Sequence, residues 1–321
     1  MLVFIIRRSL QAIVVLWVMS LLVFVGVYAV GNPIDILINP QADQQDRERA
    51  IHALGLDKSL PDQYLSFLAG AVHGDLGRSF VHSTPALSLI LERMPATLEL
   101  AATAMLIAVI LGIPLGLWAG LRPNGIAGRT IMAGSILGFS LPTFWVGLML
   151  IMVFSVMLGW LPSNGRGPTT DLLGVPVSFL SVDGWRHLIM PATNLALFNL
   201  ALLIRLTRAG AHEALLQDYV KFARAKGLSN ARVIGVHVLR NILIPIVTVI
   251  GLQLGLLLSG AVLTETIYSL PGLGRLMVDS ILSRDYPVVQ SGALFIALMF
   301  VMVNLIVDIL YAALDPRISR A

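Results

Sequence analysis

The chain has 321 residues, of which 57% are hydrophobic and only 12% are charged, and its mean hydropathy is +0.85. Soluble globular chains carry about 25% charged residues, so this composition excludes an ordinary water-soluble domain. The net charge of +4 does not indicate a nucleic-acid partner, because the basic residues lie between long apolar runs instead of forming one patch. The chain has no cysteine, which excludes disulfides, thiolate metal sites and cysteine nucleophiles.

Six apolar stretches are long enough to cross a bilayer as helices, which takes about 20 residues each. They span approximately 9–31, 98–121, 131–159, 187–207, 242–264 and 288–313. The backbone of a spanning segment must satisfy its own polar groups, so we expect an all-α integral membrane protein of six transmembrane helices. The first stretch is too long for the core of a cleavable signal peptide, and we expect it to be retained as an anchor.

The basic residues predict the orientation in the membrane. The N-terminus, 121–130, 205–241 and the C-terminal tail hold 13 Lys and Arg, whereas the segments on the other side hold nine. Short loops rich in Lys and Arg stay in the cytoplasm. We therefore expect a multi-pass membrane protein with both termini in the cytoplasm.

The segment 32–97 is expected to form a small extracytoplasmic module. Residues 42–56 favour a helix, and the sequence Ser59-Leu60-Pro61 favours the start of another around 63–72. We accordingly divide the chain into 1–97, which holds the first helix and this module, and 98–321, a core of five transmembrane helices with a cytoplasmic loop at about 209–241.

Motifs for chemistry are missing from the sequence. None of the three lysines completes a phosphate-binding loop, and the six histidines have no metal-ligand spacing. We therefore predict no catalytic residue, no metal site, no cofactor and no ATP hydrolysis by this chain. Asp308 is the one acid that we place well inside an apolar run; pairing with Arg317, Arg7 or Arg8 is favoured over a role as a proton relay.

The segment 209–241 carries the most informative pattern. It predicts a helix that continues from the fourth span and ends at Gly227, followed by a second helix through Arg240 that Ser229 or Asn230 caps. One apolar face with basic neighbours is formed by Leu215, Tyr219, Phe222 and Ala223. Such a helix–turn–helix suits insertion into a partner's cleft; a basic helix lying on anionic lipid is the alternative.

This segment resembles the coupling loop of ABC transporter permease subunits in the dipeptide/oligopeptide/nickel (binding-protein-dependent) family. The similar residues are 218–229 (DYVKFARAKGLS), 237–241 (HVLRN) and Pro245. The resemblance extends along the whole chain, through 54–61 (LGLDKSLP), 74–79 (GDLGRS), 95–100 (PATLEL), 140–145 (SLPTFW), 271–275 (PGLGR) and 314–317 (LDPR). The order and spacing of these pieces together make the resemblance specific.

The chain departs from the general Glu-Ala-Ala pattern of such loops, because it has Lys221-Phe222-Ala223 at that place. A role of the missing glutamate is therefore not transferred. The residues expected to couple to an ATPase are Tyr219, Phe222, Ala223, Gly227, Leu228 and Leu239, of which the resemblance itself supports Ala223, Gly227 and Leu239.

The resemblance implies a type I ABC importer permease fold and a set of partners. These are a second homologous permease subunit, two ATPase subunits, an extracytoplasmic solute-binding protein and the lipid bilayer, with no nucleic acid. The resemblance also suggests an outer gate at Pro271, Gly272, Gly274 and Arg275. Short peptides are the favoured cargo, with nickel chelates or glutathione-like peptides as alternatives. A secondary transporter or a channel is disfavoured, because charged residues at mid-membrane depth and a pore-lining ring are not evident.

Overall fold

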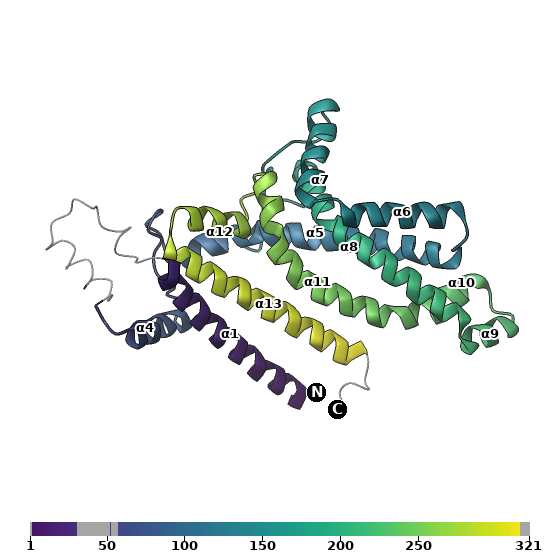
Figure 1. Ribbon diagram of the computed structural model, residues 1–321, viewed down its shortest axis with the longest axis horizontal. Helices are drawn as coiled ribbons and strands as arrows, with labels where there is room; N and C mark the ends of the chain where they lie inside the picture. The colour runs from purple at the N-terminus through teal and green to yellow at the C-terminus, as the bar shows by residue number, and fades with distance from the viewer. Residues whose placement is uncertain (1, 31–51, 53–56, 315–321) are drawn as a thin grey trace. The chain divides into compact units, whose positions relative to one another are not determined.

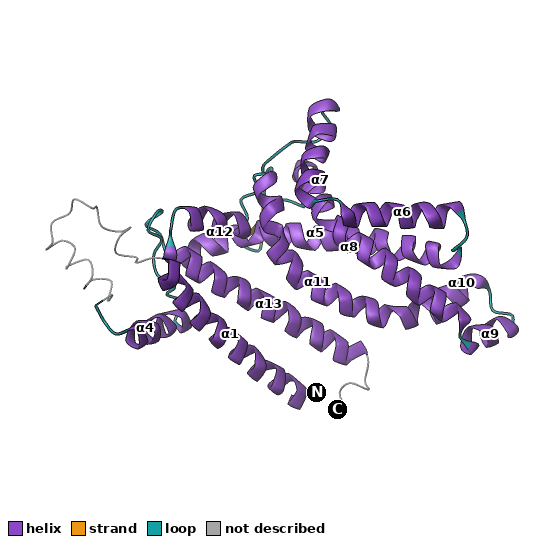
Figure 2. Ribbon diagram, viewed as in Figure 1, coloured by secondary structure: helices purple, strands orange, loops and turns teal. Residues whose placement is uncertain are grey.

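The computed structural model describes residues 2–30, 52 and 57–314, and this part of the chain forms two compact units. Unit 1 comprises residues up to Pro95 together with Pro271–Leu305, and unit 2 comprises Ala96–Leu270 and the residues from Ile306 onward. Figures 1 and 2 show that nearly all regular structure is helical. Helices α5 (Ala86–Leu121) and α13 (Tyr286–Leu314) each contribute to both units.

Five helices of the described chain are long and apolar enough to cross a membrane. The helical stretches are Ile6–Gly26 within α1 (Leu2–Val30), α5, α8 (Val182–Leu216), Asn230–Ile267, and Tyr286–Ile309 within α13. They confirm five of the six predicted spans. Helix α5 is longer than predicted: its 36 residues extend over about 54 Å, well beyond the roughly 30 Å of hydrocarbon.

The prediction of one continuous third span at 131–159 is wrong. Helix α6 (Ile126–Ser140) and the next helical stretch, α7 (Thr143–Leu150) continued by a π-helix (Ile151–Met157), are bent by 107° from each other. Leu141 and Pro142 between them are extended, with ψ angles of 136° and 130°. A proline has no N–H and disfavours helical geometry at the residue before it, so the helix ends here instead of kinking.

Unit 1 contains the predicted module next to the first helix. Helix α4 (Leu60–Val72) confirms the helix predicted near 63–72, and the Ser59 side chain caps it by accepting from the backbone N–H of Asp62. Tyr64 of α4 packs its ring against Phe24 of α1, with centroids 5.4 Å apart, and its hydroxyl lies 2.9 Å from that of Ser20. The helix predicted at 42–56 lies outside the described residues.

Helix α12 (Leu273–Leu282) is a feature of unit 1 that the sequence did not predict, since it lies between the predicted spans 242–264 and 288–313. Leu273 and Leu276 of α12 form a buried apolar cluster with Ile90 of α5 and Val288 of α13. The carboxylate of Asp285, 1% exposed, lies between α12 and α13 and accepts hydrogen bonds from the Ser79 hydroxyl and from the backbone N–H groups of residues 80 and 81. The segment around residue 80 is thereby fixed against α12 and α13.

In unit 2, helix α5 packs closely on α8 through three glycines spaced by four residues. A Cβ at Gly116 would lie 2.6 Å from the carbonyl oxygen of Ile204, and a Cβ at Gly112 or Gly120 would lie 2.9 Å from α8 atoms. Small residues on one helix face allow the backbones of membrane helices to approach each other in this way. Helix α8 also contacts α6, α7 and α11 (Leu239–Ile267), so it lies at the centre of unit 2.

Candidate functional site

The segment predicted to couple to an ATPase lies at the end of α8 in unit 2 and contains an additional break. Helix α8 ends at Leu216, Gln217 is extended (ψ 148°), and a separate helix α9 covers Asp218–Ala225. The prediction of one helix from the fourth span to Gly227 is therefore wrong. An aspartate at the first position of a helix interacts favourably with the helix dipole, which helps to start α9 at Asp218.

Gly227 ends α9 in the way that the sequence predicts. Its φ is +75°, the N–H of Gly227 donates to the Arg224 carbonyl (2.9 Å), and the N–H of Leu228 donates to the Ala223 carbonyl (3.3 Å). These two bonds form a Schellman motif, which needs a left-handed residue after the helix. A glycine takes this conformation without the Cβ penalty.

Ser229 then caps the following helix, as predicted: its hydroxyl accepts from the N–H of Arg232 at 3.4 Å. This helix does not end at Arg240. It runs through α10 (Asn230–Arg232), a π-helical stretch (Val233–Val238) and α11 without interruption, so that Asn230–Ile267 is one span of 38 residues. The prediction of a second helix distinct from the fifth span is corrected accordingly.

The predicted coupling residues divide between two faces of α9. Phe222 is 62% exposed and Tyr219 is 38% exposed, whereas Ala223 and Val220 are buried where α9 packs against α8 and the π-helix. The single face predicted from Leu215 to Ala223 is therefore wrong: the break at Gln217 leaves Leu215 in α8, and within α9 Ala223 is buried while Phe222 is exposed. Leu228 and Leu239 are half-buried.

Charged groups surround the exposed aromatic residues of α9. The Lys226 ammonium lies 4.6 Å from the centroid of the Phe222 ring. The Lys221 ammonium donates to Asp218 at 2.9 Å, and this hydrogen bond and charge hold the pKa of Asp218 below its ordinary value of 3.8. Because the folded pKa is lowered, the pair's contribution is present above pH 3.8 and is lost only as the pH falls through the lowered pKa. The Asp218 carboxylate is therefore ionised at neutral pH.

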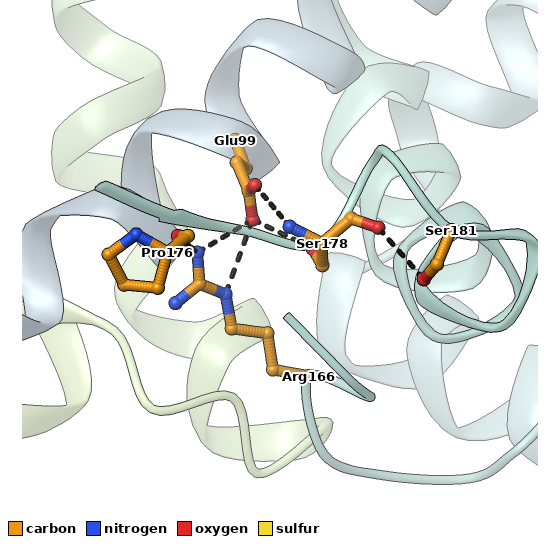
Figure 3. Close-up of polar contacts among 5 residues, drawn as sticks. All are labelled: Glu99, Arg166, Pro176, Ser178 and Ser181. Carbon is orange, nitrogen blue, oxygen red and sulfur yellow. Dashed lines mark hydrogen bonds and ion pairs between the residues drawn. The ribbon is translucent and has the colours of Figure 1, made fainter. Parts of the chain in front are cut away.

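A second polar site in unit 2 is centred on Glu99 of α5 (Figure 3). One oxygen of this buried carboxylate accepts from the Ser178 N–H at 2.6 Å. The other oxygen accepts from the Ser178 hydroxyl at 2.7 Å and from Nη2 and Nε of Arg166 at 2.9 and 3.2 Å. Arg166 also donates to the Pro176 carbonyl at 2.6 Å. Four donors thus neutralise and orient one buried carboxylate.

These bonds hold the segment that connects the π-helix (Ile151–Met157) to α8. The connection contains a short antiparallel hairpin, β1 (Thr170–Leu172) and β2 (Val175–Val177), which is an exception to the all-α expectation. Arg166 precedes the hairpin and Ser178 follows it, so the Glu99 carboxylate fastens both ends to α5. Ser181 then caps α8 by accepting from the Gly184 N–H at 2.9 Å.

A second buried carboxylate, Glu265, lies in the last turn of α11. It is fully buried, and its Oε1 accepts from the Thr97 hydroxyl of α5 at 2.6 Å. The sequence analysis did not single out Glu265, because the predicted span 242–264 ends just before it and the span 98–121 begins just after Thr97. Asp308 itself is half-buried, and its predicted partner Arg317 lies outside the described residues.

Tyr268 connects α11 to two other parts of unit 2. Its hydroxyl donates to the Gly147 carbonyl of α7 at 3.2 Å, and its own carbonyl accepts from the Gly165 N–H at 2.9 Å. Burial raises the pKa of the Tyr268 hydroxyl, which therefore stays protonated and able to donate. Glu99, Glu265 and Tyr268 were not predicted as site residues; the nearest sequence signal was the 95–100 motif, which holds Thr97 and Glu99.

The residues predicted to form an outer gate lie at the start of the second segment of unit 1, Pro271–Leu305. Gly272 precedes α12 as its N-cap residue, and Gly274 is buried in the first turn of the helix. Pro271 and Arg275 are half-buried, and both line a cavity together with Gly272. Among the described residues, no group of three or more His, Asp or Glu side chains could hold a metal ion.

Comparison with known families matches the chain along almost its whole length. The family described as "binding-protein-dependent transport system inner membrane component" matches residues 112–320, and the N-terminal family of such membrane components matches residues 1–101. The chain is also similar in fold to the membrane protein in an inward-facing structure of the MetNI methionine ABC transporter, with a TM-score of 0.56 and 15% identity over 71% of this chain and 97% of that one.

Individual relatives give the same result at higher identity. The di/tripeptide transport permease DppB of Pseudomonas aeruginosa is 44% identical over 100% of this chain and 99% of the relative. The dipeptide permease DppB of Escherichia coli K12 is 42% identical over the same shares, and the glutathione permease GsiC of E. coli K12 is 41% identical over 99% of both chains. The chain therefore belongs to the binding-protein-dependent inner membrane transport components, and it is a permease subunit of an ATP-binding-cassette importer with the type I fold, not an enzyme.

Proposed function

We propose that this chain forms half of the translocation pathway of an importer for short peptides. The observation that carries the proposal is identity above 40% over the whole chain to permeases named for dipeptides, tripeptides and glutathione, which are all short peptides. Glutathione-like peptides and nickel chelates remain the alternative cargoes within the same machinery. ATP hydrolysis would take place on partner subunits.

The proposed partners are a second homologous permease in a heterodimer, two ATPase subunits and an extracytoplasmic solute-binding protein. The ATPase contact is assigned to the coupling segment (residues 209–241), because α9 presents Tyr219 and Phe222 outward with Lys221 and Lys226 beside them. Partly exposed aromatic residues ringed by charge are typical of contact surfaces between proteins. Ala223, by contrast, would act by packing α9 in place.

The Schellman turn at Gly227 and the half-buried Leu228 and Leu239 would keep this surface fixed to the long helix Asn230–Ile267. Nucleotide could shift the transport pathway only if the ATPases contact this surface differently in their open and closed forms. The outer gate is proposed at Pro271, Gly272, Gly274 and Arg275. These residues stand where the chain passes from unit 2, which ends here at Leu270, back into unit 1, which resumes at Pro271.

A transport experiment tests the proposed cargo. A strain without peptide importers, given this chain together with its permease, ATPase and binding-protein partners, is expected to take up radiolabelled dialanine. Excess unlabelled glutathione or nickel–histidine should compete weakly, and omission of this chain should abolish uptake. Uptake of labelled nickel chelate with no dialanine uptake would reject the peptide assignment while leaving the importer machinery intact.

The orientation is tested by cysteine labelling, which the Cys-free sequence makes simple. With both termini in the cytoplasm, the hairpin residue Leu173, which is 97% exposed, faces outward, and Asn230 faces the cytoplasm. A single cysteine at position 173 should therefore react with a membrane-impermeant maleimide in intact cells, whereas one at 230 should react only after lysis. The reverse pattern would overturn the proposed orientation.

A further inference from the structure

A cavity of about 440 Å³ lies within unit 1, between the segment after α4, the start of α5 and helix α12. We call it the Arg93 pocket. Its lining residues are Val81, His82, Arg93, Pro271, Gly272, Arg275, Leu276, Asp279, Ser280 and Ser283. Pockets of about 300–1,000 Å³ with apolar walls and a few converging polar groups are the usual form of small-ligand sites.

The wall of the Arg93 pocket is held in place by buried contacts. The Asp285 carboxylate binds the backbone at residues 80 and 81, which places Val81 and His82 at the cavity. Leu276, which also lines the cavity, belongs to the buried apolar cluster of unit 1. The pocket is therefore a formed part of the fold and not a gap between loosely placed loops.

Arg93 is the unusual member of the lining. Its Nε is buried and has no hydrogen-bond acceptor, and within the described part of the chain no carboxylate pairs with its guanidinium. A buried donor without a partner costs free energy, so such a group calls for an acceptor that the described residues do not supply. An arginine fork matches the two oxygens of a carboxylate.

The other charges of the lining also favour an anion. Arg275 lies 3.8 Å from Asp279 on the same helix, and both side chains are substantially exposed, so this pair nearly cancels its own charge. His82 adds a positive charge only when protonated. The Arg93 guanidinium therefore leaves the pocket net positive, while the nearby Asp279 opposes a doubly charged anion.

We propose that the Arg93 pocket binds a carboxylate group, with Arg93 as its hydrogen-bonding partner. The site goes beyond the proposed transport role and rests on it only for the two sources of the carboxylate, the C-terminus of a short peptide or an acidic side chain of the docked binding protein. The apolar walls at Val81, Pro271 and Leu276 would contact the carbon skeleton next to the carboxylate.

A fluorophore inside the pocket gives a readout that does not depend on transport. The chain has no cysteine, so a Ser283→Cys variant, assembled with its partners in phosphatidylcholine nanodiscs, can be labelled with bimane at the pocket rim. The assembly that contains the unsubstituted chain measures background labelling of the partners. The probes are dialanine, dialanine amide, inorganic phosphate and the binding protein loaded with peptide.

Three variants carry the test in the labelled background. Arg93→Gln removes the guanidinium, Arg93→Lys keeps the charge but not the fork, and Arg284→Gln removes an equal charge from an exposed residue of unit 1 that does not line the pocket. For the probe that gives a response, Arg93→Gln should weaken binding about tenfold or more, because a charged hydrogen bond is lost. Arg93→Lys should weaken binding less. Arg284→Gln should leave the response unchanged.

The probes distinguish the two sources. A saturable response to dialanine that dialanine amide does not reproduce assigns the site to the peptide terminus. A response to the binding protein alone, weakened in Arg93→Gln, assigns it to an acidic side chain. The proposal is overturned if Arg93→Gln assembles normally by size-exclusion chromatography and responds like the wild type, if phosphate acts as well as dialanine, or if no probe changes the signal. If the uptake experiment rejects peptides as the cargo, a measured effect of Arg93→Gln on binding would still stand.

Discussion

Replacing Glu99 with alanine is expected to destabilise the subunit by about 3–5 kcal/mol, because it leaves the Arg166 guanidinium buried without its carboxylate. The Ser178 N–H and hydroxyl lose their acceptor as well. The segment that connects the π-helix (Ile151–Met157) to α8 should then detach from α5. Trypsin cleavage at Arg166 and the thermal unfolding temperature of the purified assembly measure this effect.

Glu92→Ala is the matched control, since it removes an exposed acid from the same helix. It should change neither measurement. Replacing both charged partners, in Glu99→Leu with Arg166→Met, should recover part of the loss, because an apolar pair avoids an unpaired buried charge. Equal stability of Glu99→Ala and wild type would show that the four hydrogen bonds contribute nothing net.

Gly227→Asp is expected to weaken the proposed ATPase contact by tens- to hundreds-fold. Nothing lies within 4 Å of a Cβ at this position, and aspartate tolerates a positive φ better than most residues, so the variant should keep the fold of this chain. The loss would arise from an unpaired acid within the docked surface. Gly227→Ala should cost only roughly 1 kcal/mol through the backbone.

Copurification of the ATPases, together with transport, measures the effect of Gly227→Asp. Gly174→Asp supplies the control: it adds the same charge at an exposed glycine outside the coupling segment that also has a positive φ and open space around it. If α9 instead lay on lipid, binding would follow Lys221, Arg224 and Lys226 and would fall with salt. Full assembly of Gly227→Asp combined with failure of a variant neutralised at those three residues would replace docking by the membrane-surface alternative.

Sequence periodicity predicted the long helices well because a bilayer imposes one length and one composition on every span. Local rules also predicted the two ends of the bend after α9, since Gly227 and Ser229 act through bonds to residues within five positions. The break at Gln217 was missed because an extended glutamine has no such signal. The break separates Leu215 from α9, whereas Ala223 is buried because the side of α9 that it shares with Val220 packs against α8 and the π-helix.

The Glu99 site could not be predicted from sequence because its partners come from residues 67 and 79 positions away. A single acid near the end of an apolar run indicates a constraint but not the identity of its donors. Helix α12 was missed for a similar reason: its buried face is completed by Ile90 and Val288, which only the tertiary structure brings together.

The sharp bend at Leu141–Pro142 limits what can surround it in a bilayer. Helix α6 alone, with 15 residues, is about 22 Å long and cannot cross the hydrocarbon. Proline has no N–H, so the carbonyl of Gly138 loses the donor that an unbroken helix would place at residue 142. Acyl chains cannot replace that donor. The elbow between α6 and α7 must therefore face water or another polypeptide, even though its own side chains, such as the half-exposed Phe139 and Phe144, are apolar.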